Sequence, residues 1–226
     1  MIKFEKLLLF GSRAYGSHRP NSDFDYIGVV DEYPDFGSAY TESNRTYYLY
    51  TKKDFNDALK DHDIALLESV YLNYDIPSWF TLDLGKLRVS ISTVGNNSWV
   101  KGKKKLIISS DYDKKSALKS IYHSFRIMDY GIQLAVHGGI VERGRYNWLL
   151  DELYKLGENY ERVGLWDIIQ VRYGDDWKQL RSKFKRLAPK TEMERFKNKD
   201  KLINVLKTHN VSPSNKLIKE ITKIFE

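Results

Sequence analysis

Two aspartates, Asp23 and Asp25, lie within residues 22–30, a segment otherwise apolar enough for a buried strand. Residues i and i+2 of a strand project from the same face, so both carboxylates are expected to point together while Phe24 and Tyr26 point the other way. Like charges held this close repel, and burying them is unfavourable unless a cation neutralises them. Mg²⁺ suits such a pair because it takes one or two carboxylates and completes its shell with water and phosphate oxygens. The pair predicts a site for Mg²⁺, or Mn²⁺, with both aspartates as metal ligands and catalytic residues.

A turn of small residues precedes the aspartates. Gly11 and Ser12 follow residues 5–10, an apolar run that is typical of a short strand. Glycine lets the backbone turn sharply or approach a ligand, and free N–H groups together with the Ser12 hydroxyl can bind phosphate oxygens. If the two strands are adjacent, the turn and the aspartates meet on one nucleoside triphosphate. That arrangement is typical of metal-assisted, in-line nucleotidyl transfer.

The segment GSRAYGSHRPNSDFD, residues 11–25, resembles the signature of the DNA polymerase beta-like nucleotidyltransferase superfamily in its minimal form. The likeness rests on Gly-Ser, on Ser-Asp-x-Asp and on the spacing between them, with Arg13, Gly16, Pro20 and Ser22 at family-like offsets. In more detail, the chain is similar to predicted nucleotidyltransferases associated with RNA repair in bacteria and bacteriophages, over roughly residues 5–155, closely over 7–30 and loosely beyond. The resemblance implies a sheet-and-helix catalytic domain that uses an NTP, with ATP expected, together with Mg²⁺, and that releases pyrophosphate.

The resemblance also implies a set of nucleotide-binding residues. In that branch a helical region with a Lys-x-x-x-His-x-x-Arg pattern follows the catalytic domain, and here the pattern falls on Lys119, His123 and Arg126. Their spacing places them on one helix face, where a cationic stripe can bind the triphosphate or hold the acceptor. A solvated helix face is the alternative reading. The nucleotide-binding residues implied are Gly11, Ser12, Arg13, Ser22, Lys119, His123 and Arg126.

The sequence departs from the superfamily pattern at the third carboxylate. Members usually present that acid from a neighbouring strand, where it completes the metal cluster and can act as a base on the attacking hydroxyl. The corresponding segment here, residues 45–50, reads RTYYLY and carries no acid. Glu42 and Glu68 are the candidate substitutes. The alternatives are transfer with two carboxylates or nucleotide binding without turnover.

The strands and helices expected along the chain indicate an α+β fold. We expect a small mixed nucleotidyltransferase sheet with helices, followed by a mostly helical C-terminal region. Strands are expected at residues 5–10, 22–30 and 44–51. Asp54 is the expected N-cap of a helix over 55–72, with a break at the DHD of residues 61–63. Residues 93–105, with their glycines and asparagines, favour a loop.

The second half of the chain is expected to be helical. Apolar residues at spacings of three and four predict an amphipathic helix over 116–137, ended by the glycines at 138 and 139. Two more helices are expected within 146–187, and a last one after residues 212–215. We place a domain boundary near residue 100, with a catalytic domain at 1–100 and a basic helical domain at 101–226.

Composition bears on partners and location. Residues 1–100 hold 10 Lys and Arg against 14 Asp and Glu, a net charge of −4, whereas residues 101–226 hold 27 against 16, a net charge of +11. Such a basic half favours polyanions, so RNA, above all a tRNA end, is the expected acceptor. A protein or small-molecule acceptor and a degenerate nucleotide- or RNA-binding module are the alternatives. With no cysteine, signal peptide or long apolar run, we expect a cytoplasmic protein without membrane partners.

Overall fold

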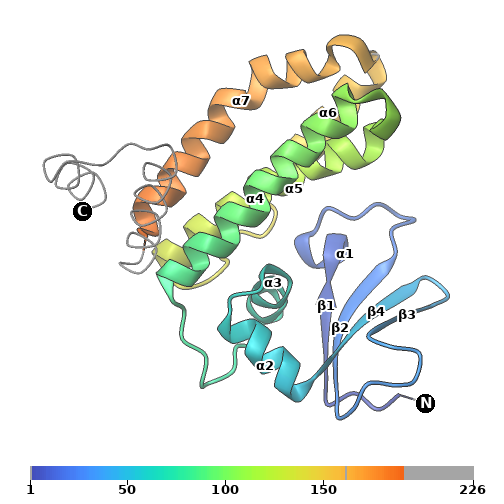
Figure 1. Cartoon of the computed structure of the whole chain (residues 1–226), viewed down its shortest axis with the longest axis vertical. Coiled ribbons are helices and arrows are strands. Elements are labelled where there is room, and N and C mark those ends of the chain that lie inside the picture. Colours follow the sequence, from blue (N-terminus) through green and yellow to red (C-terminus); the bar gives the residue numbers. More distant parts are fainter. Residues whose placement is uncertain (1, 161, 191–226) are drawn as a thin grey trace, which may run out of the picture. The chain divides into compact units, whose positions relative to one another are not determined.

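The protein is described here from a computed structural model that covers residues 2–160 and 162–190, and its fold is α+β, as predicted. Four strands form one mixed sheet in the order β1-β2-β4-β3 (Figure 1). β2 pairs antiparallel with β1 and parallel with β4, and β3 pairs antiparallel with β4. The strands are β1 Lys6–Phe10, β2 Phe24–Val30, β3 Ala39–Glu42 and β4 Arg45–Thr51. The three predicted strands are confirmed, and the short β3 is an addition.

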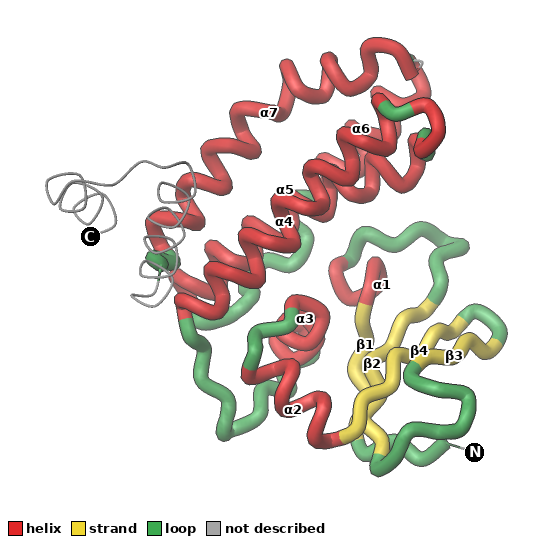
Figure 2. The backbone as a smooth tube through the Cα atoms, viewed as in Figure 1, coloured by secondary structure: helices red, strands yellow, loops and turns green. Residues whose placement is uncertain are grey.

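Helices make up most of the remaining described chain (Figure 2). They are α1 Gly11–Tyr15, α2 Lys52–Lys60, α3 Ile64–Leu72, α4 Leu84–Ile107, α5 Lys114–His137, α6 Asn147–Asn159 and α7 Arg162–Leu187, with a 3₁₀ turn at Ser109–Asp111. The predicted amphipathic helix is confirmed as α5, which ends at Gly138 in the left-handed conformation. The two helices expected within 146–187 are α6 and α7. The helix expected after residues 212–215 lies outside the described residues.

The two faces of the sheet differ because side chains alternate along each strand. Ile27 and Val29 of β2 belong to the main hydrophobic core, which they share with buried residues of the helices. Tyr26 and Val30 of β2 lie on the other face, where a smaller cluster packs around Tyr47. Asp25 therefore shares the helix-facing side of the sheet with Ile27 and Val29. This alternation points the carboxylate toward the helical half of the molecule.

The loop predicted for residues 93–105 is wrong, because these residues are part of the 24-residue helix α4. Gly95 and Gly102 lie where α4 packs on α5 and do not break the helix. A Cβ at Gly95 would approach Met128 Cε to 2.6 Å, and one at Gly102 would approach Ile121 Cγ1 to 2.5 Å. Glycine is present because the two helices approach closely, a tertiary constraint that overrides its low helix propensity.

The helix predicted over 55–72 is confirmed with its break but begins at a different cap. Asp61 to Asp63 separate α2 from α3, as expected. The N-cap is Thr51, whose side-chain oxygen accepts a hydrogen bond from the Asp54 backbone N–H at 3.2 Å. Asp54 thus lies in the first turn, where its carboxylate accepts from the Thr51 hydroxyl and favours the positive end of the helix dipole.

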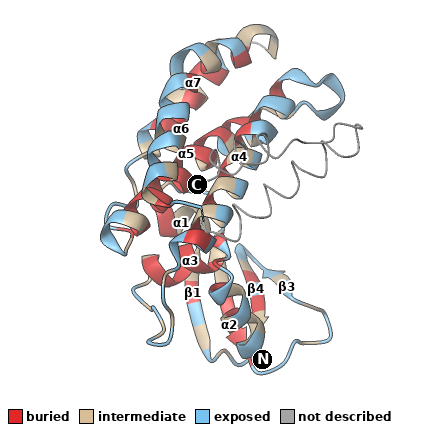
Figure 3. Ribbon diagram, turned by 60° about the vertical axis from the view of Figure 1, so that its left-hand side comes forward, coloured by how far each residue is buried: buried red, intermediate tan, exposed pale blue. Residues whose placement is uncertain are grey.

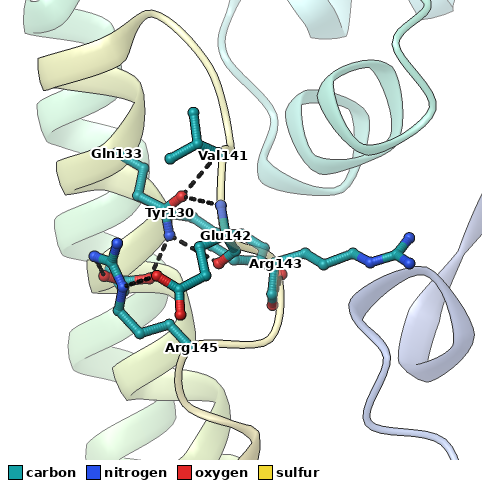
Figure 4. Close-up of polar contacts among 7 residues, drawn as sticks. Tyr130, Gln133, Val141, Glu142, Arg143 and Arg145 are labelled. Atoms are coloured by element: carbon teal, nitrogen blue, oxygen red, sulfur yellow. Dashed lines mark hydrogen bonds and ion pairs between the residues drawn. The ribbon is translucent and has the colours of Figure 1, made fainter.

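A buried glutamine organises the connection between α5 and α6 (Figure 4). Gln133 Oε1 accepts from the backbone N–H groups of Val141 and Glu142 at 2.9 and 2.8 Å, and its Nε2 donates to Asp129 at 2.5 Å. Tyr130 Oη donates to the carbonyl of Arg143 at 2.7 Å. Both anchors come from α5, so the start of α6 is fixed relative to that helix.

Most of α5 is buried (Figure 3), because α4, α6 and α7 all pack against it. Met1–Ala188 form one compact unit by their contacts. The boundary that we placed near residue 100 falls inside α4, which crosses it without interruption. Residue 100 does not separate two units, because α4 carries the chain through this point while packed on α5. None of the described helices combines the length and apolar character needed to span a membrane.

Candidate active site

A cleft of about 1190 Å³ lies between the sheet end of the molecule and the long helices. The aspartates line one side of it, and residues of α4, α5 and α6 line the rest. Of the residues predicted for the site, the cleft brings together Ser12, Ser22, Asp23, Asp25, Lys119, His123 and Arg126. Gly11 and Arg13 do not line it, although both contact residues that do.

Asp23 and Asp25 differ in environment. Asp23 is exposed just before β2, whereas Asp25 is half-buried as the second residue of that strand. The pair therefore lies at the beginning of the strand and not in its middle. Burial and the negative charge of Asp23 raise the pKa of Asp25, and the positive charge of Lys119 lowers it in part. Because the two carboxylates repel each other, this end of the cleft favours a cation.

Gly11 fits against the Asp25 carboxylate. Its φ of 69° lies in the left-handed region, which glycine adopts at little cost. A Cβ at this position would approach Asp25 Oδ2 to 2.3 Å, which is closer than two such atoms can pack. Gly11 therefore serves the site by leaving room for Asp25. The sequence predicted a close approach of the backbone to a ligand at this glycine, and the structure shows a close approach to a carboxylate.

Arg13 holds the loop that carries the aspartates. Its Nη2 donates to the carbonyl oxygen of Ser22 at 2.7 Å, and its Nε donates to that of Asp23 at 3.3 Å. The guanidinium also lies over the Phe24 ring, 3.7 Å from its centroid. These contacts position the segment that enters β2. The expected role of Arg13 in nucleotide binding stays a prediction beside these contacts.

Lysines of α4 and α5 form one wall of the cleft, which we call the lysine wall. Lys101 comes from α4, and Lys115 and Lys119 come from α5, where they lie one turn apart on the same face. All three are exposed. Lys119 is close enough to Asp25 to influence its pKa. The cleft thus pairs an acidic end with a cationic wall, an arrangement suited to a metal-bound polyphosphate.

His123 lies deeper on the same α5 face and is held by Arg126. Arg126 Nη2 donates to His123 Nδ1 at 2.8 Å. A guanidinium can only donate, so Nδ1 is unprotonated and the ring proton lies on Nε2. Burial, followed by the charges of Arg126 and Lys101, lowers the pKa of His123 to about 3. The imidazole is therefore neutral at physiological pH and can offer an N–H donor but cannot serve as a base.

Arg126 forms a buried ion pair. Its Nη1 donates to Glu68 Oε1 of α3, and both side chains are almost fully buried. The guanidinium lies over the Tyr15 ring, 3.5 Å from its centroid. These contacts join α1, α3 and α5 behind the cleft. Glu68, one of our two candidates for the third acid, does not line the cleft and neutralises Arg126 instead.

The strand position beside Asp25 carries a hydroxyl. In the parallel β2–β4 pair, Asp25 is in register with Thr46, whose Oγ1 lies 3.1 Å from Thr41 Oγ1. Glu42, the other candidate acid, is exposed at the end of β3 and does not line the cleft. Among the described residues, no group of three or more His, Cys, Asp or Glu side chains converges as a metal site.

The far end of the cleft contains residues that sequence reasoning missed. The Arg19 guanidinium lies 4.2 Å from the ring centroid of Tyr154, which comes from α6 together with Leu150 and Glu158. Asn147 connects α6 to the site, since it accepts from the Tyr122 hydroxyl at 2.7 Å and donates to the Tyr15 carbonyl at 3.2 Å. No short motif marks these residues, because only the tertiary fold brings α6 to the cleft.

Comparison of the chain with models of protein families, with curated proteins and with solved structures returned no match in any of the three.

Proposed function

We propose that the protein is a Mg²⁺-dependent nucleotidyltransferase that moves an NMP from an NTP, with ATP expected, to an acceptor on RNA and releases pyrophosphate. One observation carries the proposal: a single cleft joins Asp23 and Asp25, which repel each other, to a wall of exposed lysines. A pair of neighbouring carboxylates favours a bound cation, and exposed lysines favour a bound phosphate group. A metal-bound triphosphate satisfies both.

The donor set fits a magnesium ion. Asp23 and Asp25 offer two carboxylates, and Mg²⁺ is commonly bound by one or two carboxylates plus waters and phosphate oxygens. Burial, followed by the negative charge of Asp23, raises the pKa of Asp25, so a bound cation would stabilise its ionised form. A bound Mg²⁺ would neutralise the triphosphate and stabilise charge that develops during transfer.

The chain's own residues would hold and orient the triphosphate. Ser12 offers a hydroxyl to the phosphates beside Asp25, and Lys119 offers a positive charge across the cleft. Neutral His123 offers a donor deeper in the cleft, fixed by Arg126. An acceptor oxygen would bond to the α-phosphorus as the bond to the departing pyrophosphate breaks. Such transfer depends mainly on positioning and electrostatic stabilisation.

RNA as the acceptor is supported by charge and by the aromatic end of the cleft. The second half of the chain has a net charge of +11. Tyr154, with Arg19 over its ring, provides stacking surfaces of the kind that bind single-stranded bases. A tRNA end is the form of RNA that we expect. A protein or small-molecule acceptor has no comparable feature in its favour among the described residues.

The test is pyrophosphate release from each of the four NTPs with Mg²⁺ or Mn²⁺, with and without bulk tRNA. Asp23→Asn with Asp25→Asn should abolish release, because these isosteric changes remove the metal ligands without altering size. Asp35→Asn, which removes an exposed acid outside the cleft, is the matched control and should keep full activity. Full activity in the double variant would refute the proposal.

A degenerate nucleotide-binding module is the second candidate, because no third carboxylate accompanies the pair in the described residues. In that case ATP would still bind, and binding would weaken in Lys119→Gln, but no pyrophosphate would appear with any nucleotide or RNA. Calorimetric titration of ATP beside the release assay separates the two functions.

A further inference from the structure

We propose that the acceptor group is a terminal phosphate monoester of RNA, held by Lys101 and Lys115, and not a sugar hydroxyl. The inference rests on the proposed nucleotidyl transfer and names the chemical group that receives the nucleotide. Two independent features of the cleft support it: the described residues supply no general base beside the aspartate pair, and the lysine wall extends beyond the aspartate end.

A sugar hydroxyl needs a base, and the cleft does not provide one near the metal ligands. Thr46 occupies the strand position beside Asp25, and Glu68 is paired with buried Arg126. His123 is neutral, with Nδ1 already accepting from Arg126, and its pKa of about 3 leaves it unable to take up a proton near neutral pH. Glu158, the remaining cleft carboxylate among the described residues, comes from the last turn of α6, at the Tyr154 end.

A phosphate monoester needs no base. Its second pKa is about 6, so at neutral pH it is largely a dianion with a ready nucleophilic oxygen. An alcohol must instead lose a proton that it holds much more tightly. A site with two carboxylates and no base therefore matches an acceptor that is already ionised.

The lysine wall provides for a second anion. Lys119 lies close enough to Asp25 to affect its pKa and belongs to the triphosphate end. Lys115 lies one turn away on α5, and Lys101 faces the cleft from α4. Within residues 2–160 and 162–190, neither Lys101 nor Lys115 makes a hydrogen bond or ion pair through its ammonium group, whereas neighbouring Lys114 donates to the Gly157 carbonyl at 2.7 Å. Both ammonium groups are therefore available to a phosphate.

The reaction balances without a proton. A non-bridging oxygen of the acceptor phosphate forms a bond to the α-phosphorus of the NTP. The bond from that phosphorus to the oxygen shared with the β-phosphate breaks, and pyrophosphate leaves with the electron pair. The product is an RNA end capped with an NMP through a phosphoanhydride, and no oxidant, reductant or further reactant is required.

The experiment uses the full chain, Mg²⁺, ATP labelled at the α-phosphate, and one oligoribonucleotide made in four forms. The forms carry hydroxyls at both ends, a 5′-phosphate, a 3′-phosphate, or both phosphates. We expect label on phosphate-bearing RNA at least about tenfold above the hydroxyl form, a difference of about 1.4 kcal/mol in transition-state stabilisation. The label should resist alkaline phosphatase and be released by an enzyme that cleaves phosphoanhydrides.

Other outcomes separate this inference from the proposed function. Equal labelling of the hydroxyl form would overturn the phosphate acceptor and leave nucleotidyl transfer standing. Labelling of a nucleoside monophosphate in preference to phosphorylated RNA would overturn RNA as its carrier. Absence of both label and pyrophosphate with every acceptor would overturn the inference and the proposed function together.

Variants test the two lysines. Lys115→Gln and Lys101→Gln should each raise the KM for phosphorylated RNA about tenfold, or about 1.4 kcal/mol, and should raise it by more than they raise the KM for ATP. Lys104→Gln removes an exposed lysine of α4 that does not line the cleft, and it should change neither value. Unchanged RNA KM values in both cleft variants would overturn the assignment.

Discussion

At the scale of single residues, the site depends on how Asp25 is accommodated. Its carboxylate is half-buried, faces the charge of Asp23 and fits against the missing Cβ of Gly11. Burial and the charge of Asp23 make the ionised form less stable in the folded protein without a cation, whereas the missing Cβ of Gly11 gives the carboxylate room. The folded, metal-free protein is therefore less stable at neutral pH than it would be with an uncharged side chain at position 25.

Because the ionised Asp25 carboxylate destabilises the metal-free folded protein, Asp25→Asn should be more stable than the wild type in EDTA, by an amount that depends on pH. Burial and Asp23 raise the pKa of Asp25 above 3.8, so the folded state binds the proton more tightly than the unfolded state. The penalty is therefore absent below pH 3.8 and grows as pH rises through the raised pKa. At pH 7 the variant should melt about 2 °C higher, since about 1 kcal/mol shifts a protein of this size by about 2–4 °C and solvent screens a half-exposed group.

Thermal melts between pH 3 and pH 8 check this expectation, with Asp35→Asn as the control. The gain should disappear near pH 3.5 and also when saturating Mg²⁺ stabilises the wild type. A variant that melts lower than the wild type at pH 7 in EDTA would show that Asp25 is stabilised as a carboxylate by other groups.

His123 gives a second residue-level prediction. Because Nδ1 accepts from Arg126 and burial lowers the pKa to about 3, the ring should remain the neutral Nε2–H tautomer from pH 5 to pH 8. Long-range ¹H–¹⁵N NMR spectra distinguish this tautomer directly, with exposed His18 as an internal reference. A His123 signal that titrates near pH 6.5 would contradict the assigned contact.

At the scale of elements, the packing of α4 on α5 sets the lysine wall. Gly102 lets the helices approach, since a Cβ there would lie 2.5 Å from Ile121 Cγ1 and 3.1 Å from the Ala117 carbonyl. The neighbouring residue Lys101 faces the cleft, so the distance between the two helices also fixes where its ammonium group can reach.

Gly102→Ala should therefore destabilise the protein by about 1 kcal/mol. Overpacking lowers the free energy of unfolding by about 1–3 kcal/mol, and the better helix propensity of alanine offsets about 1 kcal/mol of this loss. Urea denaturation measures the change. Gly139→Ala is the control, because nothing lies within 4 Å of its Cβ position. A stabilised Gly102→Ala variant would mean that the interhelical contact is looser than described.

Sequence reasoning succeeded for elements whose signals are local. Apolar spacing identified α5, and β-branched and aromatic residues identified β4. It failed where tertiary packing overrides local preference, as in α4, whose glycines are typical of a loop but serve a close helix contact. The same limit applies to the site, because the aspartate pair is a local motif whereas the Arg19–Tyr154 contact joins residues far apart in the chain.

At the scale of the whole molecule, the residues proposed for catalysis are distributed over one folded unit. Asp25 belongs to the sheet, which Asp23 directly precedes, the lysines belong to α4 and α5, and Tyr154 belongs to α6. The buried Arg126–Glu68 pair and the Asn147 contacts join these parts behind the cleft. A sheet and a helical region that each fold alone would not need such polar links between them.

Division of the chain at residue 100 is therefore expected to yield no folded half. The cut falls within α4 and separates Ile91 and Gly95 from their contacts with Gly131 and Met128 of α5, which exposes the buried side chains of Ile91 and Met128. Circular dichroism melts of the fragments 1–100 and 101–226 should show no cooperative transition, unlike the full chain. Cooperative unfolding of either fragment would support an independent domain after all.

The measurement that tests the central claim most directly is Mg²⁺-dependent release of pyrophosphate from ATP in the presence of RNA. It compares the wild type with the Asp23→Asn, Asp25→Asn double variant and with Asp35→Asn. We expect release by the wild type and by Asp35→Asn, and none by the double variant although it remains folded. Equal release by all three proteins would contradict the assignment of the aspartate pair as the catalytic centre.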